Sequence, residues 1–170
     1  MNKLILDTSV FIKMRHKKCV NVIESLLNRY TTFEVFVSDM TFFELIRQCN
    51  NIVEIQKTRE ILNQYGRYSV DTDMIAYATY YVNVLSKHKK SDGKFSIQSK
   101  QLSDSDAIIG ATAMRGNSFL CTTDSTDFPQ PFFSEISSDL LFPESTDKIF
   151  IFKPDTSLYD RSLRKFIKIG

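Results

Sequence analysis

The sequence has few of the residues on which histidine, disulfide and zinc chemistry depend. It contains only two histidines, His16 and His88, which argues against any mechanism that relies on several imidazoles. Its three cysteines, Cys19, Cys49 and Cys121, are odd in number, far apart and include no CxxC pair. This usage argues against a disulfide framework and a zinc site, and it favours a reducing, cytoplasmic location.

Long hydrophobic runs are also missing. No stretch approaches the roughly 18 consecutive apolar residues of a membrane span. The N-terminus enters an apolar strand directly, without the basic region and cleavage site of a secretory signal. With 170 residues, 42% of them hydrophobic and 25% charged, the composition is typical of a globular protein. We expect a single domain with a substantial core, located in the cytoplasm and without a membrane segment.

A strong excess of charge is absent too, because the net charge is only +2. This small value conceals three basic clusters, at residues 15–18, 87–90 and 161–168. Such clusters are most often solvated surface, but they also suit contacts to phosphates around an acidic centre. The candidate RNA-binding residues are Arg15, Lys17, Lys18, Lys87, Lys89 and Lys90.

What the sequence does contain is an alternation of strands and helices. The apolar run that begins at Leu4 and ends at Asp7 is typical of a strand buried on both faces, as at the centre of a parallel sheet. Hydrophobic periodicity predicts the remaining elements, and their order indicates an α/β fold with a mostly parallel sheet. Further strands are predicted at 33–37, up to Val70, 118–122 and 148–152, and helices at 17–30, 40–49, 52–65, 74–85, 103–115 and after Asp155. The pattern leaves 132–144 undetermined and makes 86–101 the longest loop.

Four acidic residues stand out by position. Asp7 ends the first strand, Glu44 is the one charge in an apolar helical segment, Asp106 lies in the first turn of a helix, and Asp124 follows the 118–122 strand. Strand carboxyl ends and the helix starts that follow them share one rim of a doubly wound sheet. We therefore expect the four side chains to converge there.

Each acid also has an ordinary structural interpretation. Asp7 suits the N-cap of the next helix. Glu44 can pair with Arg47 or reach Gln48 one turn on. The run Ser103-Asp104-Ser105-Asp106 matches a capping box, and Asp124 with Asp127 suits an Asx turn. We place Asp104 and Asp127 as supporting residues around the four acids.

Clustering favours a metal site over these alternatives. Carboxylates that lie close together repel, which raises their pKa values unless a cation compensates. Mg²⁺ and Mn²⁺ prefer oxygen ligands, and no Cys/His set competes for them here. Such an ion activates water and neutralises charge on a phosphodiester, and two ions stabilise both the attacking and the leaving oxygen.

The same residues resemble a known family. The segment Leu6-Asp7-Thr8-Ser9-Val10-Phe11-Ile12 looks like the opening motif of PIN domains, particularly VapC-type ribonuclease toxins. The resemblance continues through Glu44, through Asp106-Ala107-Ile108-Ile109-Gly110-Ala111-Thr112-Ala113, and through Thr122-Thr123-Asp124-Ser125-Thr126-Asp127-Phe128. It extends to about Pro154, which divides the chain into a PIN-like nuclease domain at 1–154 and a C-terminal helical extension at 155–170 packed on that domain.

This resemblance implies a three-layer α/β/α fold and metal-dependent hydrolysis of RNA that leaves 5′-phosphate and 3′-hydroxyl ends. By motif position, Asp7, Glu44, Asp106 and Asp124 are the catalytic, metal-binding acids, with Mg²⁺ or Mn²⁺ as cofactor. Ser9 supports Asp7 through its hydroxyl, and Asp127 is a secondary acid. An RNA substrate, an antitoxin protein that inserts into the active-site groove, and a homodimer are the partners that the family implies. The chain is longer than the compact toxins of this family. This departure weighs against a toxin role more than against the nuclease site.

Two other classes compete with this hypothesis. A catalytically inactive PIN module that binds RNA or a protein partner is the main alternative, and the intact acids argue against it. A phosphotransferase of the haloacid dehalogenase type also begins with an Asp after its first strand. That family requires D-x-D, and here the second acidic position is Ser9.

Overall fold

The computed structural model describes residues 1–88, 102–144 and 146–169, which form six strands and seven helices. The predicted 86–101 loop therefore lies mostly outside the described residues. The strands are β1 (Lys3–Leu6), β2 (Glu34–Ser38), β3 (Gly66–Tyr68), β4 (Phe119–Thr122), β5 (Phe133–Leu140) and β6 (Lys148–Pro154). The helices are α1 (Thr8–Met14), α2 (Lys17–Asn28), α3 (Asp39–Arg47), α4 (Ile52–Leu62), α5 (Thr72–Lys87), α6 (Asp104–Arg115) and α7 (Thr156–Ile169).

The strands form one sheet in the order β3-β2-β1-β4-β6-β5. The first four are parallel, and β6 and β5 add an antiparallel ribbon beyond β4. The prediction of a mostly parallel α/β sheet is confirmed. The strand β5 occupies the segment that the sequence pattern left undetermined.

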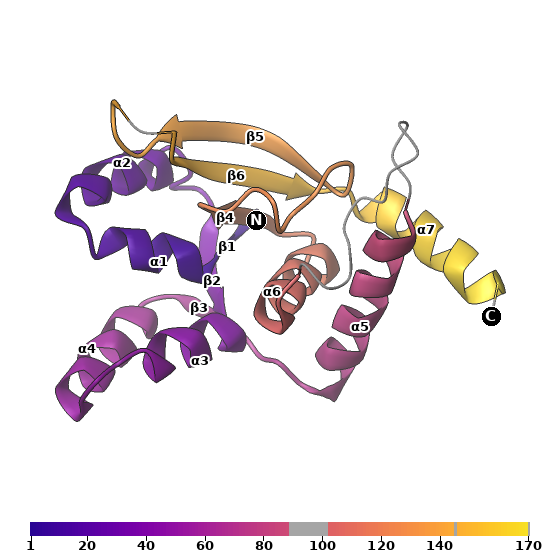
Figure 1. Cartoon of the computed structure of the whole chain (residues 1–170), viewed down its shortest axis with the longest axis horizontal. Helices are drawn as coiled ribbons and strands as arrows, with labels where there is room; N and C mark the ends of the chain where they lie inside the picture. The colour runs from indigo at the N-terminus through magenta and orange to yellow at the C-terminus, as the bar shows by residue number, and fades with distance from the viewer. Residues whose placement is uncertain (89–101, 145, 170) are drawn as a thin grey trace.

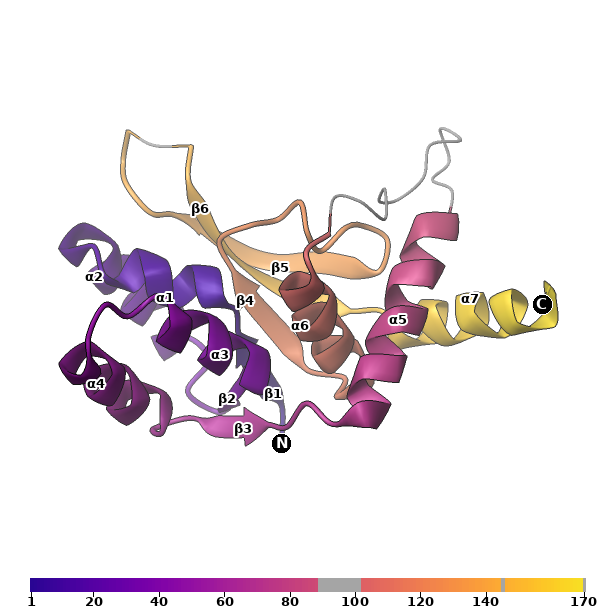
Figure 2. The same ribbon diagram turned by 60° about the horizontal axis from the view of Figure 1, so that its bottom comes forward.

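Helices cover both faces of this sheet. Alternation along β1 sends Ile5 to one face and Leu4 and Leu6 to the other. On the Ile5 face, α5, α6 and α7 build the core, whereas α1 to α4 build the core on the opposite face. Figure 1 and Figure 2 show the two helical groups on either side of the sheet. The α/β/α layering is therefore present, and none of the described helices is long and apolar enough to cross a membrane.

Two elements differ from their sequence predictions. The first strand ends beside Asp7 as predicted, but the next segment is helix α1, which was not among the predicted helices; the extended residue Asp7 caps it. The strand predicted to end at Val70 is β3, and it ends earlier, at Tyr68. Val70 is in the linker before α5, and Asp71 is the N-cap of that helix.

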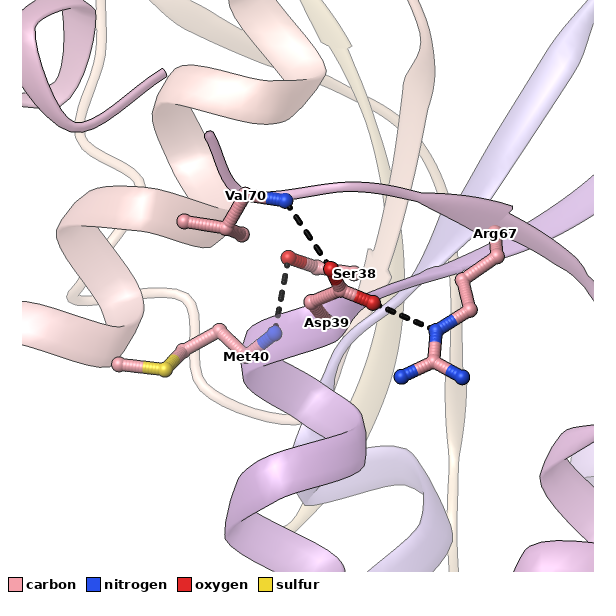
Figure 3. Close-up of polar contacts among 5 residues, drawn as sticks. All are labelled: Ser38, Asp39, Met40, Arg67 and Val70. Carbon is pink, nitrogen blue, oxygen red and sulfur yellow. Dashed lines mark hydrogen bonds and ion pairs between the residues drawn. The ribbon is translucent and has the colours of Figure 1, made fainter. Parts of the chain in front are cut away.

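The junction between β2 and α3 is held by short polar contacts (Figure 3). Ser38 is the N-cap of α3, and its hydroxyl accepts a hydrogen bond from the Met40 amide at 3.2 Å. The Asp39 carboxylate accepts from Arg67 Nε at 2.5 Å and from the Val70 amide at 3.1 Å. These contacts tie the start of α3 to the chain that leaves β3, and so they fix the helix that carries Glu44.

The packing of α5 against α6 requires a glycine at position 110. A Cβ at Gly110 would lie 2.7 Å from the Tyr81 hydroxyl and 2.9 Å from Tyr81 Cζ. Tyr81 is fully buried and packs edge-on against Phe133 and near Tyr159, so a shift of its ring would disturb these contacts. This close approach places α6, whose first turn carries Asp106, directly against α5.

We expect Gly110→Ala to lower the free energy of unfolding, because overpacking costs about 1–3 kcal/mol and exceeds the roughly 1 kcal/mol of helix propensity that alanine adds. Urea unfolding of wild type and variant measures the difference. Adding Tyr81→Phe, which removes the nearest clashing atom, should restore part of the loss. A Gly110→Ala protein more stable than wild type would contradict this packing.

Candidate active site

Asp7 is the buried centre of the rim where the parallel strands end, with only 3% of its surface exposed. The register that pairs Leu6 with Cys121 brings the end of β1 beside the end of β4. One Asp7 oxygen, Oδ1, accepts the Thr8 amide at 2.7 Å. The other, Oδ2, accepts hydroxyls from Ser9 at 2.6 Å and Thr122 at 2.7 Å. Asp7 is thus both the predicted helix cap and a carboxylate held by two hydroxyls.

These two hydroxyls also hold the loop after β4. Ser9 Oγ accepts the Thr123 amide at 3.0 Å, and Thr122 Oγ1 accepts the Asp124 amide at 3.0 Å. The hydrogen bond predicted between Ser9 and Asp7 is present. Asp7 and the backbone of Asp124 are consequently joined through a single side chain.

Glu44 is half-buried on α3 and turns toward the same rim. Its Oε2 accepts a hydrogen bond from Thr8 Oγ1 at 2.5 Å. The alternative pairing is not found in the described part of the chain: no ion pair joins Glu44 to Arg47, and the Arg47 guanidinium lies over the Phe43 ring instead. Glu44 is therefore linked to β1 through the residue that follows Asp7.

Asp106 lies in the first turn of α6 and is half-buried. Ser103 is the N-cap, its Oγ accepting the Asp106 amide at 3.1 Å and donating to Asp106 Oδ2 at 2.5 Å. The capping interaction suggested by the sequence is thus formed. Asp104, the proposed supporting residue, is exposed in the same turn.

Asp124 and Asp127 occupy the loop after β4. Asp124 is exposed, and its Oδ1 accepts the Thr126 amide at 2.9 Å and the Thr126 hydroxyl at 2.7 Å. This is the Asx-type turn that the sequence suggested. Asp127 is half-buried three residues further on.

Mutual repulsion shows that the acids share one electrostatic environment. Burial raises the pKa of Asp7, and the charge of Asp106 adds to the rise. Burial also raises the pKa of Asp106, with further contributions from the charges of Glu44 and Asp124. The pKa of Asp127 rises to about 7, through burial and the neighbouring charges of Asp106, Asp124 and Asp7. A bound cation would relieve this repulsion.

The acids nevertheless do not form a closed metal cage. Among residues 1–88, 102–144 and 146–169, no group of three or more His, Cys, Asp or Glu side chains is arranged to hold an ion. Asp106 and Asp124 instead direct oxygens to Ser103 and Thr126. The donor set fits a hard divalent ion in chemistry and in electrostatics, since all its ligands are carboxylates that repel one another.

Sequence reasoning missed Thr8 and Thr122 as site residues. Both are buried, and together they connect Asp7, Glu44 and the Asp124 loop. The available signal was their position, since Thr8 directly follows the acid that ends β1 and Thr122 ends the neighbouring strand. Only the pairing of β1 with β4 shows that the Thr122 hydroxyl reaches Asp7.

A family model described as PIN domain matches residues 4–131 of the chain. The chain belongs to the PIN domain family. A search of curated proteins finds no match. Among solved structures, a toxin-antitoxin complex from Klebsiella pneumoniae is similar, with 18% identity and a TM-score of 0.55 over 76% of this chain and 92% of the other. At that identity, the structural likeness supports the fold alone.

The residues matched to the PIN domain include all four acids but neither β5, β6 nor α7. Of these elements, α7 packs on α5 and α6 through the buried ring of Tyr159. The described contacts place α7 in the same core as the PIN domain. The proposed boundary between residues 154 and 155 stays a prediction.

The predicted RNA-binding cations of the PIN domain are dispersed. Arg15 is the C-cap of α1, about 12 Å along the helix axis from the N-cap Asp7, and its charge acts on Glu54 of α4. Lys17 and Lys18 begin α2. Lys87 ends α5, while Lys89 and Lys90 lie outside the described residues.

Proposed function

We propose that the chain is a metal-dependent endoribonuclease that hydrolyses RNA phosphodiester bonds. The observation that carries this proposal is the grouping of Asp7, Glu44, Asp106 and Asp124 at one rim of a PIN domain. There the charge of Asp106 adds to the raised pKa of Asp7, and the charges of Glu44 and Asp124 add to the raised pKa of Asp106. An RNA-cleaving centre of this kind needs carboxylates that lose their protons when a cation arrives. The coupled acids meet that requirement.

Asp7 is the residue best prepared to hold a cation. The Thr8 amide holds Oδ1 of this carboxylate, and the hydroxyls of Ser9 and Thr122 hold Oδ2, so its orientation is fixed. Asp106, Asp124 and Glu44 would complete the ligand set by giving up hydrogen bonds to the hydroxyls of Ser103, Thr126 and Thr8. Mg²⁺ or Mn²⁺ at this position would supply an activated water and neutralise charge on the phosphodiester.

Cleavage of end-labelled total RNA by purified protein tests the proposal, with Mg²⁺, Mn²⁺ or EDTA present. We expect discrete products that depend on the metal and carry 5′-phosphate and 3′-hydroxyl ends. A folded protein that binds RNA but cleaves none with either metal would instead support the inactive PIN module. Hydrolysis of a small phosphate ester alone would point away from RNA.

We expect Thr122→Val to reduce cleavage about 10- to 100-fold, the usual cost of losing an outer partner of a metal ligand. Valine keeps the shape of threonine but removes both the hydrogen bond to Asp7 and the acceptor for the Asp124 amide. The measurement is kcat/KM at saturating metal, followed by the metal concentration that gives half-maximal rate.

Thr112→Val is the matched control for this variant. Thr112 is equally buried, but its hydroxyl donates to the Ile108 carbonyl within α6 and touches none of the four acids. Its activity should stay close to that of wild type. Equal losses in the two valine variants would show that Thr122 acts only through stability.

We further propose that the chain is the toxin of a toxin-antitoxin pair, with an antitoxin protein and a second copy of the chain as partners. The support is the PIN fold shared with the Klebsiella pneumoniae complex. Induced expression in bacteria should arrest growth, and the Asp7→Asn protein should not. Normal growth on expression of an active nuclease would contradict the toxin role and leave the nuclease proposal intact.

A further inference from the structure

A groove of about 500 Å³ lies between the end of α5 and the middle of α7. Both ribbon views show these two helices next to each other (Figures 1 and 2). Apolar side chains of Val84 and Leu158 line it, together with the cationic side chains of Lys87, Arg161 and Lys165. None of the described residues that line it is acidic. The charge of the groove is thus opposite in sign to that of the acidic rim.

We propose that this groove binds a nucleotide of single-stranded substrate RNA, on one side of the bond that is cleaved. Arg161 and Lys165 would contact its phosphates, and Val84 and Leu158 would support its base. The inference rests on the proposed ribonuclease function, and it adds a substrate site on α7, outside the residues that match the family.

The acidic rim creates the need for such a site. Four carboxylates repel the RNA backbone, so affinity must come from cations placed beside them. Arg161 and Lys165 are four residues apart and therefore share one face of α7. Both are exposed, and the structure gives neither an ion pair with a described residue. The acid beside them, Asp160, acts electrostatically on Tyr77 and Tyr159 and does not line the groove.

Helix α5 connects the groove to the acids. The charges of Asp106 and Asp127 act on Tyr81, whose burial raises its pKa. Lys87 follows Tyr81 by six residues, or about 9 Å along the helix axis. At the same end, the His88 ring packs edge-on against Phe132 at 4.9 Å between centroids, five residues after Asp127. Helix α5 therefore carries residues that face the acids and residues that line the groove, so one strand of RNA could contact both along this helix.

The lining favours single-stranded RNA over a duplex. Proteins that bind single strands combine cations along the backbone with surfaces on which unstacked bases rest. A duplex keeps its bases stacked inside and would leave the apolar floor of Val84 and Leu158 without a partner. The groove therefore fits a flexible or looped region of RNA.

The test compares Arg161→Ala/Lys165→Ala with Arg164→Ala/Lys148→Ala, each in an Asp7→Asn background that does not cleave. The control pair removes the same charge from exposed positions that do not line the groove. Fluorescence anisotropy with a labelled single-stranded RNA, at several salt concentrations, gives Kd and its salt dependence. We expect the groove variant to bind about tenfold more weakly at low salt, with a log–log salt slope smaller by about 1.4, or 0.7 for each lost phosphate contact. The control should match its parent.

Equal weakening of RNA binding in both double variants would overturn the groove proposal. It would also be overturned if the groove variant lost as much affinity for duplex RNA as for single-stranded RNA. Retained RNA binding with lost binding of an acidic peptide would assign the groove to a protein ligand instead. Because binding is measured without cleavage, the two proposals fail separately. If the groove variant binds RNA more weakly but the wild type shows no nuclease activity, the groove proposal stands and the nuclease proposal fails. If the wild type is an active nuclease but the groove variant binds RNA as its parent does, the nuclease proposal stands and the groove proposal fails.

Discussion

Replacement of Asp7 by Asn is expected to abolish metal-dependent RNA cleavage while the protein stays folded. Asp7 is the most buried of the four acids and receives hydrogen bonds from Thr8, Ser9 and Thr122. Asparagine has the same shape but offers one neutral oxygen, so it cannot hold a divalent ion in the same way. The loss of kcat/KM should exceed the roughly 10- to 100-fold that removal of an outer partner costs.

The same substitution should not lower the stability of the metal-free protein at neutral pH. Burial raises the pKa of Asp7, so the fold disfavours its charged form, and a neutral amide removes that cost. The Ser9 and Thr122 hydroxyls can each accept a hydrogen bond from the new amide group. Loss of activity together with equal or higher Tm in EDTA is the expected pair of results, as is typical where stability is given up for function.

Asp71→Asn is the control for charge removal. Asp71 caps α5 through the Met74 amide at 2.8 Å, and asparagine is an equally good N-cap. Cleavage should be unchanged. The assignment of Asp7 would be wrong if its asparagine variant remained folded and as active as wild type.

Much of the fold follows from local patterns in the sequence. The buried runs of β1 and β4 and the helix caps at Ser38, Asp71 and Ser103 all sit where apolar periodicity and capping chemistry place them. The strand β5 could not be predicted, because its residues Phe133–Leu140 are mostly exposed and polar. It forms because its backbone pairs with β6, a contact that no local pattern encodes.

The sequence predicted where the four acids lie in the fold, but not how their side chains are directed. Strand ends and helix starts indicated which acids lie on the rim, and the raised pKa values of Asp106 and Asp127, to which neighbouring acids contribute, agree with that placement. The side-chain directions depend on contacts between distant segments, such as Thr8 with Glu44 across 36 residues and Asp7 with Thr122 across 115. The capping and Asx-turn interpretations of Asp106 and Asp124 do not exclude the metal hypothesis. A cation would replace only the hydroxyl contacts of these carboxylates, and the backbone contacts between Ser103 and Asp106 and between Asp124 and Thr126 would remain.

The metal-free protein is expected to lose stability as pH rises from about 4 to about 7, and Mg²⁺ or Mn²⁺ should reverse this loss. Asp7, Asp106 and Asp127 have raised pKa values in the folded state, that of Asp127 reaching about 7. Between the unfolded value of 3.8 and the raised folded value, the folded state binds more protons than the unfolded state. The free energy of unfolding therefore falls with rising pH across this window and levels off above it.

Thermal unfolding in EDTA, Mg²⁺ and Mn²⁺ at several pH values measures both effects. Metal ligands must be deprotonated, so the increase in Tm on adding metal should be larger at pH 7.5 than at pH 5. Asp127→Asn should flatten the pH dependence in EDTA, because it removes the acid with the most clearly raised pKa. A Tm that falls as pH rises in EDTA but does not change on addition of either metal would confirm the repulsion among the acids. It would contradict the proposal that a metal ion binds there and relieves this repulsion.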